Sequence, residues 1–301
     1  MSKSRRWIVI AGSIVVVAGV GIVFAVGANT PHSVSGLVNP SPRPTVSLPS
    51  STPTGPVYTQ PDAATLAGLP DANYNAVIPG LLDAATAADL PLPVETFTLK
   101  ADLTPLYGAD RWGVPVATLP FLNFLGSRTV VVPVLLNDGE WTEILTPSRR
   151  ELPSASASAS AASQTMAWVR TDQLVVSARL TQYVLVSLSM RTLSIVNTTD
   201  GVVTATYSVG VGKADTASPV GLTYLEARYD DPEQVEGHPI YLTGAHSSVA
   251  DHPFGPDQGL VGIHWDAVHA GAVSHACIRL DAAGDRAMSG LPVGTPVLVV
   301  E

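Results

Sequence analysis

Cysteine is almost absent from this chain, since Cys277 is the only one in 301 residues. A single cysteine excludes an intrachain disulfide, and it excludes zinc or iron–sulfur sites that are built on cysteine pairs. Charged residues are also scarce, at 14% of the sequence, and the net charge is -9. Recognition of nucleic acid requires a basic stripe, so this composition argues against a nucleic-acid partner.

The N-terminus combines a basic tip with a long apolar run. Lys3, Arg5 and Arg6 precede residues 7–28, which carry no charged side chain. A helix of that length can cross the hydrocarbon core of a bilayer. Because basic residues favour the cytoplasmic side, we expect residues 1–28 to be a retained single-pass anchor in the cell membrane, with the rest of the chain extracellular. A cleaved signal peptide is the alternative.

Composition divides the remainder into three regions. Residues 29–62 are rich in Pro, Ser and Thr, which predicts an extended linker or stalk. Residues 63–176 are predicted to form a small β-rich spacer domain, whose short strands and glycine turn resemble an SH3-like barrel; a β-rich spacer of another fold is the alternative. Residues 177–301 are predicted to form a mostly-β domain with one short helix.

Individual elements follow from alternating apolar residues and from turn signals. In the middle region we expect a helix at 83–88, strands at 129–136, 140–145 and 166–170, a turn at 137–139 and a flexible loop at 154–162. In the last region we expect strands at 183–189, 192–197, 202–211, 240–242, 261–264 and 297–300, a turn at 198–201 and a helix at 281–289.

The histidines gather near the single cysteine. Apart from His32, all of them lie between residues 238 and 275. The thiolate is the reactive form of cysteine, and a nearby imidazole can generate it and hold it as an ion pair. His264 ends one predicted strand and Cys277 begins another short apolar segment, so the two strand ends can bring imidazole to sulfur. We predict that Cys277 is a nucleophile and His264 its base; a buried structural cysteine is the alternative.

Neighbouring residues have candidate roles at the same site. In an extended segment His275 shares a face with Cys277, where it can raise the local positive potential or orient substrate. The N–H groups of Ala276 and Cys277 are candidate oxyanion donors. Arg279 can bind a carboxylate with two hydrogen bonds or form a surface salt bridge, and His246 is a candidate for the cleft wall. We interpret the remaining candidates as loop residues: Lys213, His238, His252 and His269.

Neither a cofactor nor a metal ion is predicted. Histidine-rich segments do bind zinc. This segment, however, has no His-x-x-x-His pair of the kind that places two ligands on one helix face.

The stretch from residue 177 to residue 301 resembles the L,D-transpeptidases of the YkuD type. The family signature has a Gly-Ile-His strand and a Ser/Thr-His-Gly-Cys motif, which residues 262–264 and 274–279 (Ser-His-Ala-Cys-Ile-Arg) match. Residues 209–213 and 218–221 are similar to the Gly-Lys strand and Thr-Pro-x-Gly turn of the family, and residues 242–247 to its cleft wall.

This resemblance implies a β-sandwich-like catalytic domain that acts on the stem peptides of peptidoglycan in cell wall biogenesis. Cys277 would attack the third residue of a tetrapeptide stem and release D-alanine, and an amine of a second stem would resolve the thioester into a 3→3 cross-link. His264 would be the base, with its far ring nitrogen held by a backbone carbonyl, while His275 and Ser274 would shape the site. Carbapenem-type inhibitors are expected to acylate the cysteine.

Three positions depart from the family pattern. Ala276 replaces the motif glycine, Trp265 replaces a small residue, and the stretch between His264 and Ser274 is short. If position 276 requires a positive φ, alanine costs strain there. Two alternative functions therefore stay open, namely an L,D-carboxypeptidase, in which water resolves the acyl-enzyme, and a non-catalytic cell-wall-binding protein on the same scaffold.

Overall fold

The computed structural model describes residues 57–84, 90–137, 139–231, 237–251 and 259–301. Gly55–Glu301 form one compact unit. The predicted anchor at residues 7–28 and most of the predicted linker lie outside the described residues. Within the described ranges, no helix is long and apolar enough to cross a membrane.

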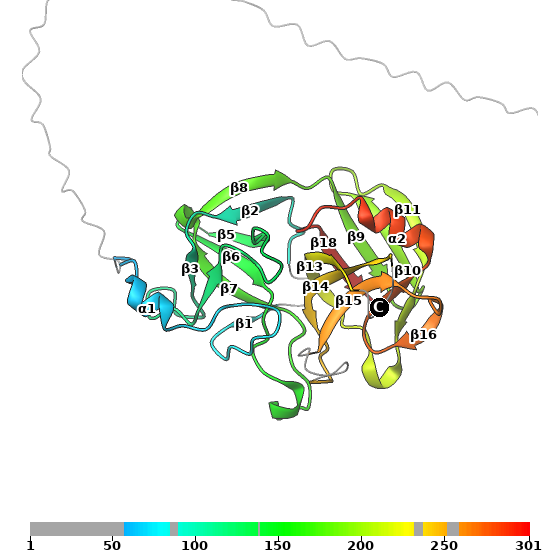
Figure 1. The fold of residues 1–301 in the computed structure, drawn as a ribbon, viewed down its shortest axis with the longest axis horizontal. Helices are drawn as coiled ribbons and strands as arrows, with labels where there is room; N and C mark the ends of the chain where they lie inside the picture. The colour runs from blue at the N-terminus through cyan, green and yellow to red at the C-terminus, as the bar shows by residue number, and fades with distance from the viewer. Residues whose placement is uncertain (1–56, 85–89, 138, 232–236, 252–258) are drawn as a thin grey trace, which may run out of the picture. The chain divides into compact units, whose positions relative to one another are not determined.

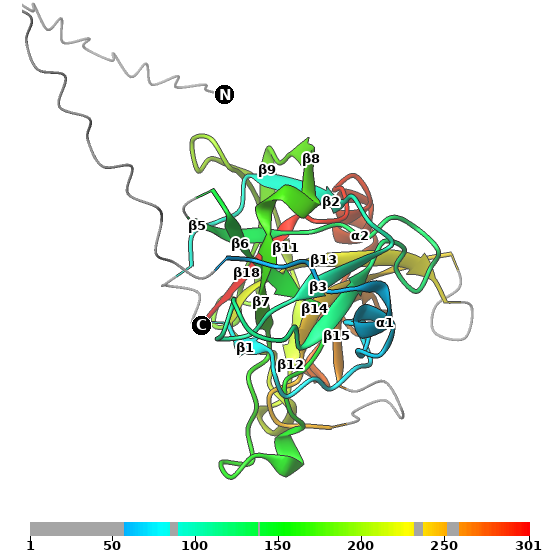
Figure 2. The same cartoon turned by 90° about the vertical axis from the view of Figure 1, so that its left-hand side faces the viewer.

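The N-terminal part of the unit is built from short antiparallel strands. It begins with α1 (Ala63–Ala67), whose N-cap Asp62 accepts a hydrogen bond of 2.7 Å from the Thr65 N–H. A four-stranded sheet and two strand pairs follow (Figure 2). The four-stranded sheet has the order β1 (Leu82–Asp83), β7 (Thr165–Arg170), β6 (Trp141–Thr146), β5 (Pro133–Asn137), and the pairs are β2 (Glu95–Leu99) with β8 (Leu174–Arg179) and β3 (Leu103–Leu106) with β4 (Ala117–Pro120).

Several predictions for this part are confirmed. The strands expected at 140–145 and 166–170 are β6 and β7, and they pair in register from Trp141↔Arg170 onward. The strand expected at 129–136 begins later, at Pro133. The loop at 154–162 contains no strand, only the end of a 3₁₀ turn at Pro153–Ala155.

The helix expected at 83–88 is wrong at its first residue. Asp83 lies in β1 and pairs with Thr165, because the edge of the four-stranded sheet offers a partner that local composition does not reveal. Residues 85–89 lie outside the described part of the chain. The broader SH3-like assignment stays a prediction.

The C-terminal part contains a ten-stranded sheet among the described residues. Its order is β11 (Val203–Ser208), β10 (Thr192–Asn197), β9 (Gln182–Ser187), β18 (Pro296–Val300), β13 (Gly221–Asp230), β14 (Pro239–His246), β15 (Leu260–Trp265), β17 (Ile278–Leu280), β12 (Gly210–Gly212), β16 (Gly271–Ser274). The sheet curls around a hydrophobic core that includes Val184, Leu193, Ile263 and Leu280. This agrees with the mostly-β fold predicted for residues 177–301.

One helix covers this core. α2 (Ala282–Ser289) lies beside β11, β14, β15 and β17 (Figure 1). Its N-cap is Asp281, which accepts hydrogen bonds from the N–H groups of Ala283 (3.1 Å) and Gly284 (2.8 Å). An N-cap carboxylate satisfies backbone donors that the first turn leaves unpaired. The helix predicted at 281–289 is therefore confirmed.

The longest strand of the sheet was not predicted. β13 spans Gly221–Asp230 and lies between β18 and β14. Its Leu-Glu-Ala-Arg stretch suits a helix on local propensity, and burial between two neighbouring strands overrides that preference. The strand expected at 202–211 is also divided, into β11 and β12.

The N-terminal strands and the C-terminal sheet share buried contacts. Val134 and Met166 pack in one hydrophobic cluster with Leu222 and Tyr224 of β13. Arg149, only 1% exposed, donates to the backbone carbonyl oxygens of Ser247 (2.6 Å) and Ala250 (2.9 Å). Burial lowers the pKa of its guanidinium to about 10.

Candidate active site

Cys277 lies immediately before β17, which pairs with β15. β15 and β17 are parallel neighbours with Ile263 opposite Ile278, so Gly262 lies level with Cys277. The Gly262 N–H donates to Sγ of Cys277 at 3.5 Å. Cys277 is 8% exposed, and none of the hydrophobic clusters formed by the described residues includes it.

His264 lies on the same face of the sheet as the sulfur. Ile263 and Ile278 point into the core, and side chains alternate along a strand, so His264 and Cys277 both point to the opposite face. Strand geometry places their Cα atoms about 8 Å apart. Nδ1 of His264 contacts the Trp265 carbonyl oxygen at 2.8 Å, which requires a proton on Nδ1 and leaves Nε2 as the basic nitrogen. This is the contact that the family resemblance implies for the base.

The electrostatics favour a neutral pair at rest. Burial raises the pKa of the Cys277 thiol, although the Gly262 N–H and the charge of Arg279 oppose the rise. Burial also lowers the pKa of His264. Both shifts oppose the ion pair expected from the sequence, because desolvation disfavours both charged forms. A neutral imidazole can still act as a general base toward the thiol.

The turn from Ser274 to Cys277 is held by two serines. Oγ of Ser274 donates to the Cys277 carbonyl oxygen at 2.5 Å, and Oγ of Ser218 donates to the Ala276 carbonyl oxygen at 2.7 Å. A trans peptide points its N–H away from its C=O, so Ser218 also fixes the direction of the Cys277 N–H. Among the described residues, the N–H groups of Ala276 and Cys277 have no acceptor.

Ala276 has a positive φ of 87° and is completely buried. The position therefore requires the backbone conformation that glycine adopts without strain. This bend also corrects the extended segment expected at residues 275–277. His275 lies in the bend and is exposed, so the reasoning that gave it the same face as Cys277 does not apply.

Arg279 supports the loop that follows β15. Its Nε lies 3.2 Å from Oδ2 of Asp266, and Nη1 donates to the Val268 carbonyl oxygen at 3.4 Å. Arg279 is also opposite His264 in the strand register. The salt bridge considered for Arg279 from the sequence is present. Together with the hydrogen bond to Val268, it holds the residues that follow His264 in place.

The structure places His246 away from any open cleft. The side chain is 1% exposed, and its Nε2 contacts the Tyr74 carbonyl oxygen at 2.9 Å. Burial lowers the pKa of His246 to about 4, so the ring is neutral at physiological pH. This burial, with the turn that contains Tyr74 in contact with the ring, does not support the role predicted for His246 in binding substrate, which stays a prediction.

Two other histidines are more engaged than a loop position suggests. His238 bonds Oδ2 of Asp285 through Nδ1 at 2.7 Å and stacks on Trp265, with ring centroids 4.7 Å apart. His269, expected to be solvent-exposed, is half-buried, and its Nδ1 contacts the Asp266 carbonyl oxygen at 2.9 Å. His252 lies outside the described residues.

Ser218 and Gly212 are parts of the site that residue chemistry alone did not single out. The Gly212 N–H donates to Oγ of Ser218 at 2.9 Å. A Cβ on Gly212 would lie 2.3 Å from the Thr216 carbonyl oxygen, so only glycine allows this close turn. The sequence signal that could have identified them is the Gly-Lys and Ser-Pro-x-Gly pattern. Its serine, Ser218, holds the turn from Ser274 to Cys277.

The comparison with protein families identifies the C-terminal part of the chain. Residues 181–299 match the model of the YkuD family, the L,D-transpeptidase catalytic domain. The resemblance predicted from residues 177–301 is therefore confirmed for the C-terminal part of the chain. No curated protein matches the chain.

Solved structures of L,D-transpeptidases are similar at low identity. The Ldtfm–avibactam carbamoyl enzyme has 21% identity and a TM-score of 0.31 and covers 42% of this chain. A mutant L,D-transpeptidase from Enterococcus faecium has 21% identity, a TM-score of 0.30 and the same coverage of 42%. The match spans 55% of the length of each of these two. An L,D-transpeptidase from Mycobacterium smegmatis has 16% identity and a TM-score of 0.32, and the match covers 58% of this chain and 91% of that one.

Proposed function

We propose that the YkuD-type domain is a peptidoglycan L,D-transpeptidase that uses Cys277 as its nucleophile and His264 as its base. The observation that carries the proposal is the placement of both side chains on one face of β15 and β17, with Nδ1 of His264 held by the Trp265 carbonyl and Nε2 left basic. The proposal includes an extracellular domain anchored by residues 1–28, which faces the cell wall.

The first step forms the acyl-enzyme. Sγ attacks the carbonyl carbon of the third residue of a tetrapeptide stem while Nε2 of His264 accepts the thiol proton. The N–H groups of Ala276 and Cys277 then stabilise the oxyanion, and Ser218 fixes the direction of the second of them. When the tetrahedral intermediate collapses, the C–N bond breaks and the leaving D-alanine takes the proton from His264.

The second step transfers the acyl group. The side-chain amine of another stem attacks the thioester, a new amide bond forms, and the C–S bond breaks. The proton lost by the amine returns to sulfur through His264. If water attacks instead, the same acyl-enzyme gives an L,D-carboxypeptidase. Ser274 supports both versions, because it holds the Cys277 carbonyl and keeps the turn in place.

The test is acylation of the full-length chain by a carbapenem, followed by intact mass measurement. The expected result is a single adduct on the native protein and none on Cys277→Ala. Incubation with a disaccharide-tetrapeptide then distinguishes the acceptors. A product with the mass of a cross-linked dimer identifies the transpeptidase, and loss of D-alanine without a dimer identifies the carboxypeptidase.

A non-catalytic cell-wall-binding protein is the second candidate. It is favoured by the 8% exposure of Cys277 and by the rise that burial causes in the pKa of its thiol. Absence of an adduct at excess carbapenem, in a protein that still binds peptidoglycan sacculi in a sedimentation assay, would establish this role and refute the enzymatic one.

A further inference from the structure

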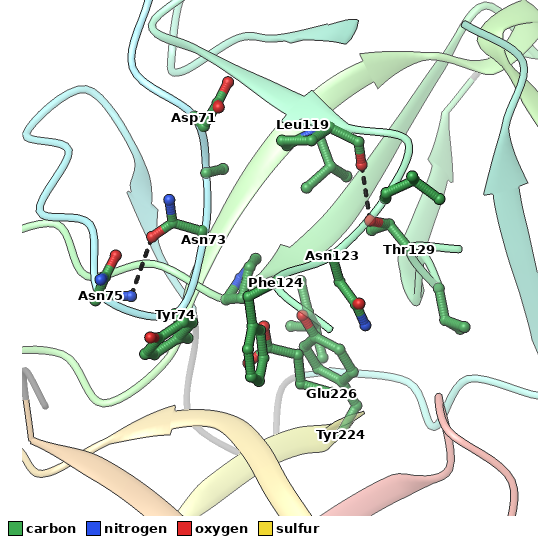
Figure 3. Close-up of a pocket in the computed structure, with 16 residues that line it drawn as sticks. Asp71, Asn73, Tyr74, Asn75, Leu119, Asn123, Phe124, Thr129, Tyr224 and Glu226 are labelled. Atoms are coloured by element: carbon green, nitrogen blue, oxygen red, sulfur yellow. Dashed lines mark hydrogen bonds between the residues drawn. The ribbon is translucent and has the colours of Figure 1, made fainter. Parts of the chain in front are cut away.

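A pocket lies between the N-terminal strands and β13, and none of the predicted catalytic residues lines it. Its volume is about 340 Å³, within the usual range of about 300–1,000 Å³ for small-ligand sites. Figure 3 shows side chains from the segment around Asn73 and Tyr74, from the loop around Phe124, and from β13. Both halves of the chain thus build it.

Glu226 is the unusual residue of this pocket. In β13 the register with β14 shifts between Leu225 and Ala227, so Glu226 is the extra residue of a β-bulge. A bulge redirects the side chain of its extra residue. The carboxyl group of this extra residue lines the pocket. In a strand without the bulge, residue 226 would instead lie opposite a residue of β14.

The Glu226 carboxyl group is buried and unpartnered. The residue is 9% exposed, and Oε2 has no hydrogen-bond partner among the described residues. Burial raises the pKa of Glu226 well above its ordinary value. Buried polar groups in native proteins are nearly always hydrogen-bonded, so an orphan carboxyl oxygen lining a cavity indicates a missing ligand.

The rest of the lining decides the charge of that ligand. The pocket contains a second carboxyl group, Asp71, and no lysine, arginine or histidine among its lining residues. The rings of Tyr74 and Phe124 lie 4.4 Å apart between their centroids, and Figure 3 shows Phe124 between Tyr74 and Glu226. Aromatic faces attract cations, and carboxylates pair with them, whereas the lining offers an anion no cationic side chain.

We propose that this pocket binds a primary alkylammonium group, with its nitrogen at the Glu226 carboxylate and its alkyl chain against Tyr74 and Phe124. The site is independent of the chemistry at Cys277. Tyr224, 2% exposed, closes the pocket beside Glu226. Its ring has room only because residue 244 is glycine, where a Cβ would lie 2.4 Å from Cε1 of Tyr224.

The test measures binding of n-pentylammonium to the full-length chain by saturation-transfer NMR titration. The native protein should show saturable binding. A bound ammonium ion favours the carboxylate form of Glu226 and opposes the rise that burial causes in its pKa. Glu226→Gln keeps the shape of the side chain but cannot ionise. We expect it to weaken binding at least about tenfold, because the charge-assisted hydrogen bond is lost. The uncharged 1-pentanol should bind native protein at least about tenfold more weakly than the ammonium ion.

Two controls make the outcome decisive. Glu143→Gln makes the same change at a half-buried glutamate that does not line the pocket, so it should bind like the native protein. Cys277→Ala should also bind normally, which separates this proposal from the enzymatic one. Equal affinity of native protein and Glu226→Gln, equal affinity for 1-pentanol, or absence of saturable binding would each overturn the proposal.

Discussion

The replacement of Ala276 by glycine tests how the turn from Ser274 to Cys277 is stabilised. Ala276 has a φ of 87°, and its methyl group is buried against Ala245 and Val261. Glycine would relieve the backbone strain and would remove that packing. The two effects have opposite signs, so the stability of the variant measures their balance.

The magnitudes nearly cancel. Left-handed backbone costs alanine about 1–2 kcal/mol, and glycine loses about 0.5–1 kcal/mol through the extra entropy of its unfolded state. Burial of one methyl group contributes about 0.8 kcal/mol. The free energy of unfolding of Ala276→Gly should therefore lie within about 0.5 kcal/mol of the native value.

A matched control exists in the same chain. Ala159 also has a positive φ, of 52°, and it is exposed. Ala159→Gly relieves strain without losing packing, so it should stabilise the protein by about 0.5–1 kcal/mol. Urea unfolding with an unchanged m value measures both variants. The reasoning is refuted if Ala276→Gly proves at least as stabilising as Ala159→Gly, or if Ala159→Gly destabilises.

Four further predictions follow from burial and hydrogen bonding. Burial raises the pKa of Cys277 and lowers that of His264, so iodoacetamide alkylation should keep increasing with pH above the free-cysteine value of about 8.5; a plateau below pH 7 would show an ion pair instead. The same shifts predict that stability falls as pH rises through about 8.5, because the folded thiol resists ionisation, and as pH falls below about 6.5, because the folded imidazole resists protonation. Arg149→Met leaves buried carbonyls of residues 247 and 250 without a donor and should cost about 3 kcal/mol or more in urea unfolding, whereas Arg128→Met, at an exposed arginine, should change stability by less than about 0.5 kcal/mol. Asp281→Ala removes the N-cap of α2 and should lower the unfolding free energy by about 1 kcal/mol; an unchanged urea midpoint would show that the cap contributes nothing.

Local patterns predicted the elements whose neighbours in sequence are also their neighbours in space. β10 and the turn after it, β15, and α2 were all found at or within two residues of the expected bounds. Alternation, turn residues and capping residues act over a few positions. Residue chemistry identified Cys277 and His264 as a candidate pair, and the family model matches residues 181–299, within the stretch where the motifs carry the resemblance.

The sequence by itself determined which reactive groups this chain carries: a single thiol at Cys277, the histidines near it, and a Ser-His-Ala-Cys motif. Tertiary structure decided the environment of those groups. The burial of His246 beneath Tyr74, the positive φ of Ala276 and the bulge at Glu226 each depend on segments far apart in the chain. Desolvation and strand register arise only when such segments meet, because both are properties of the packed neighbours rather than of the residue itself.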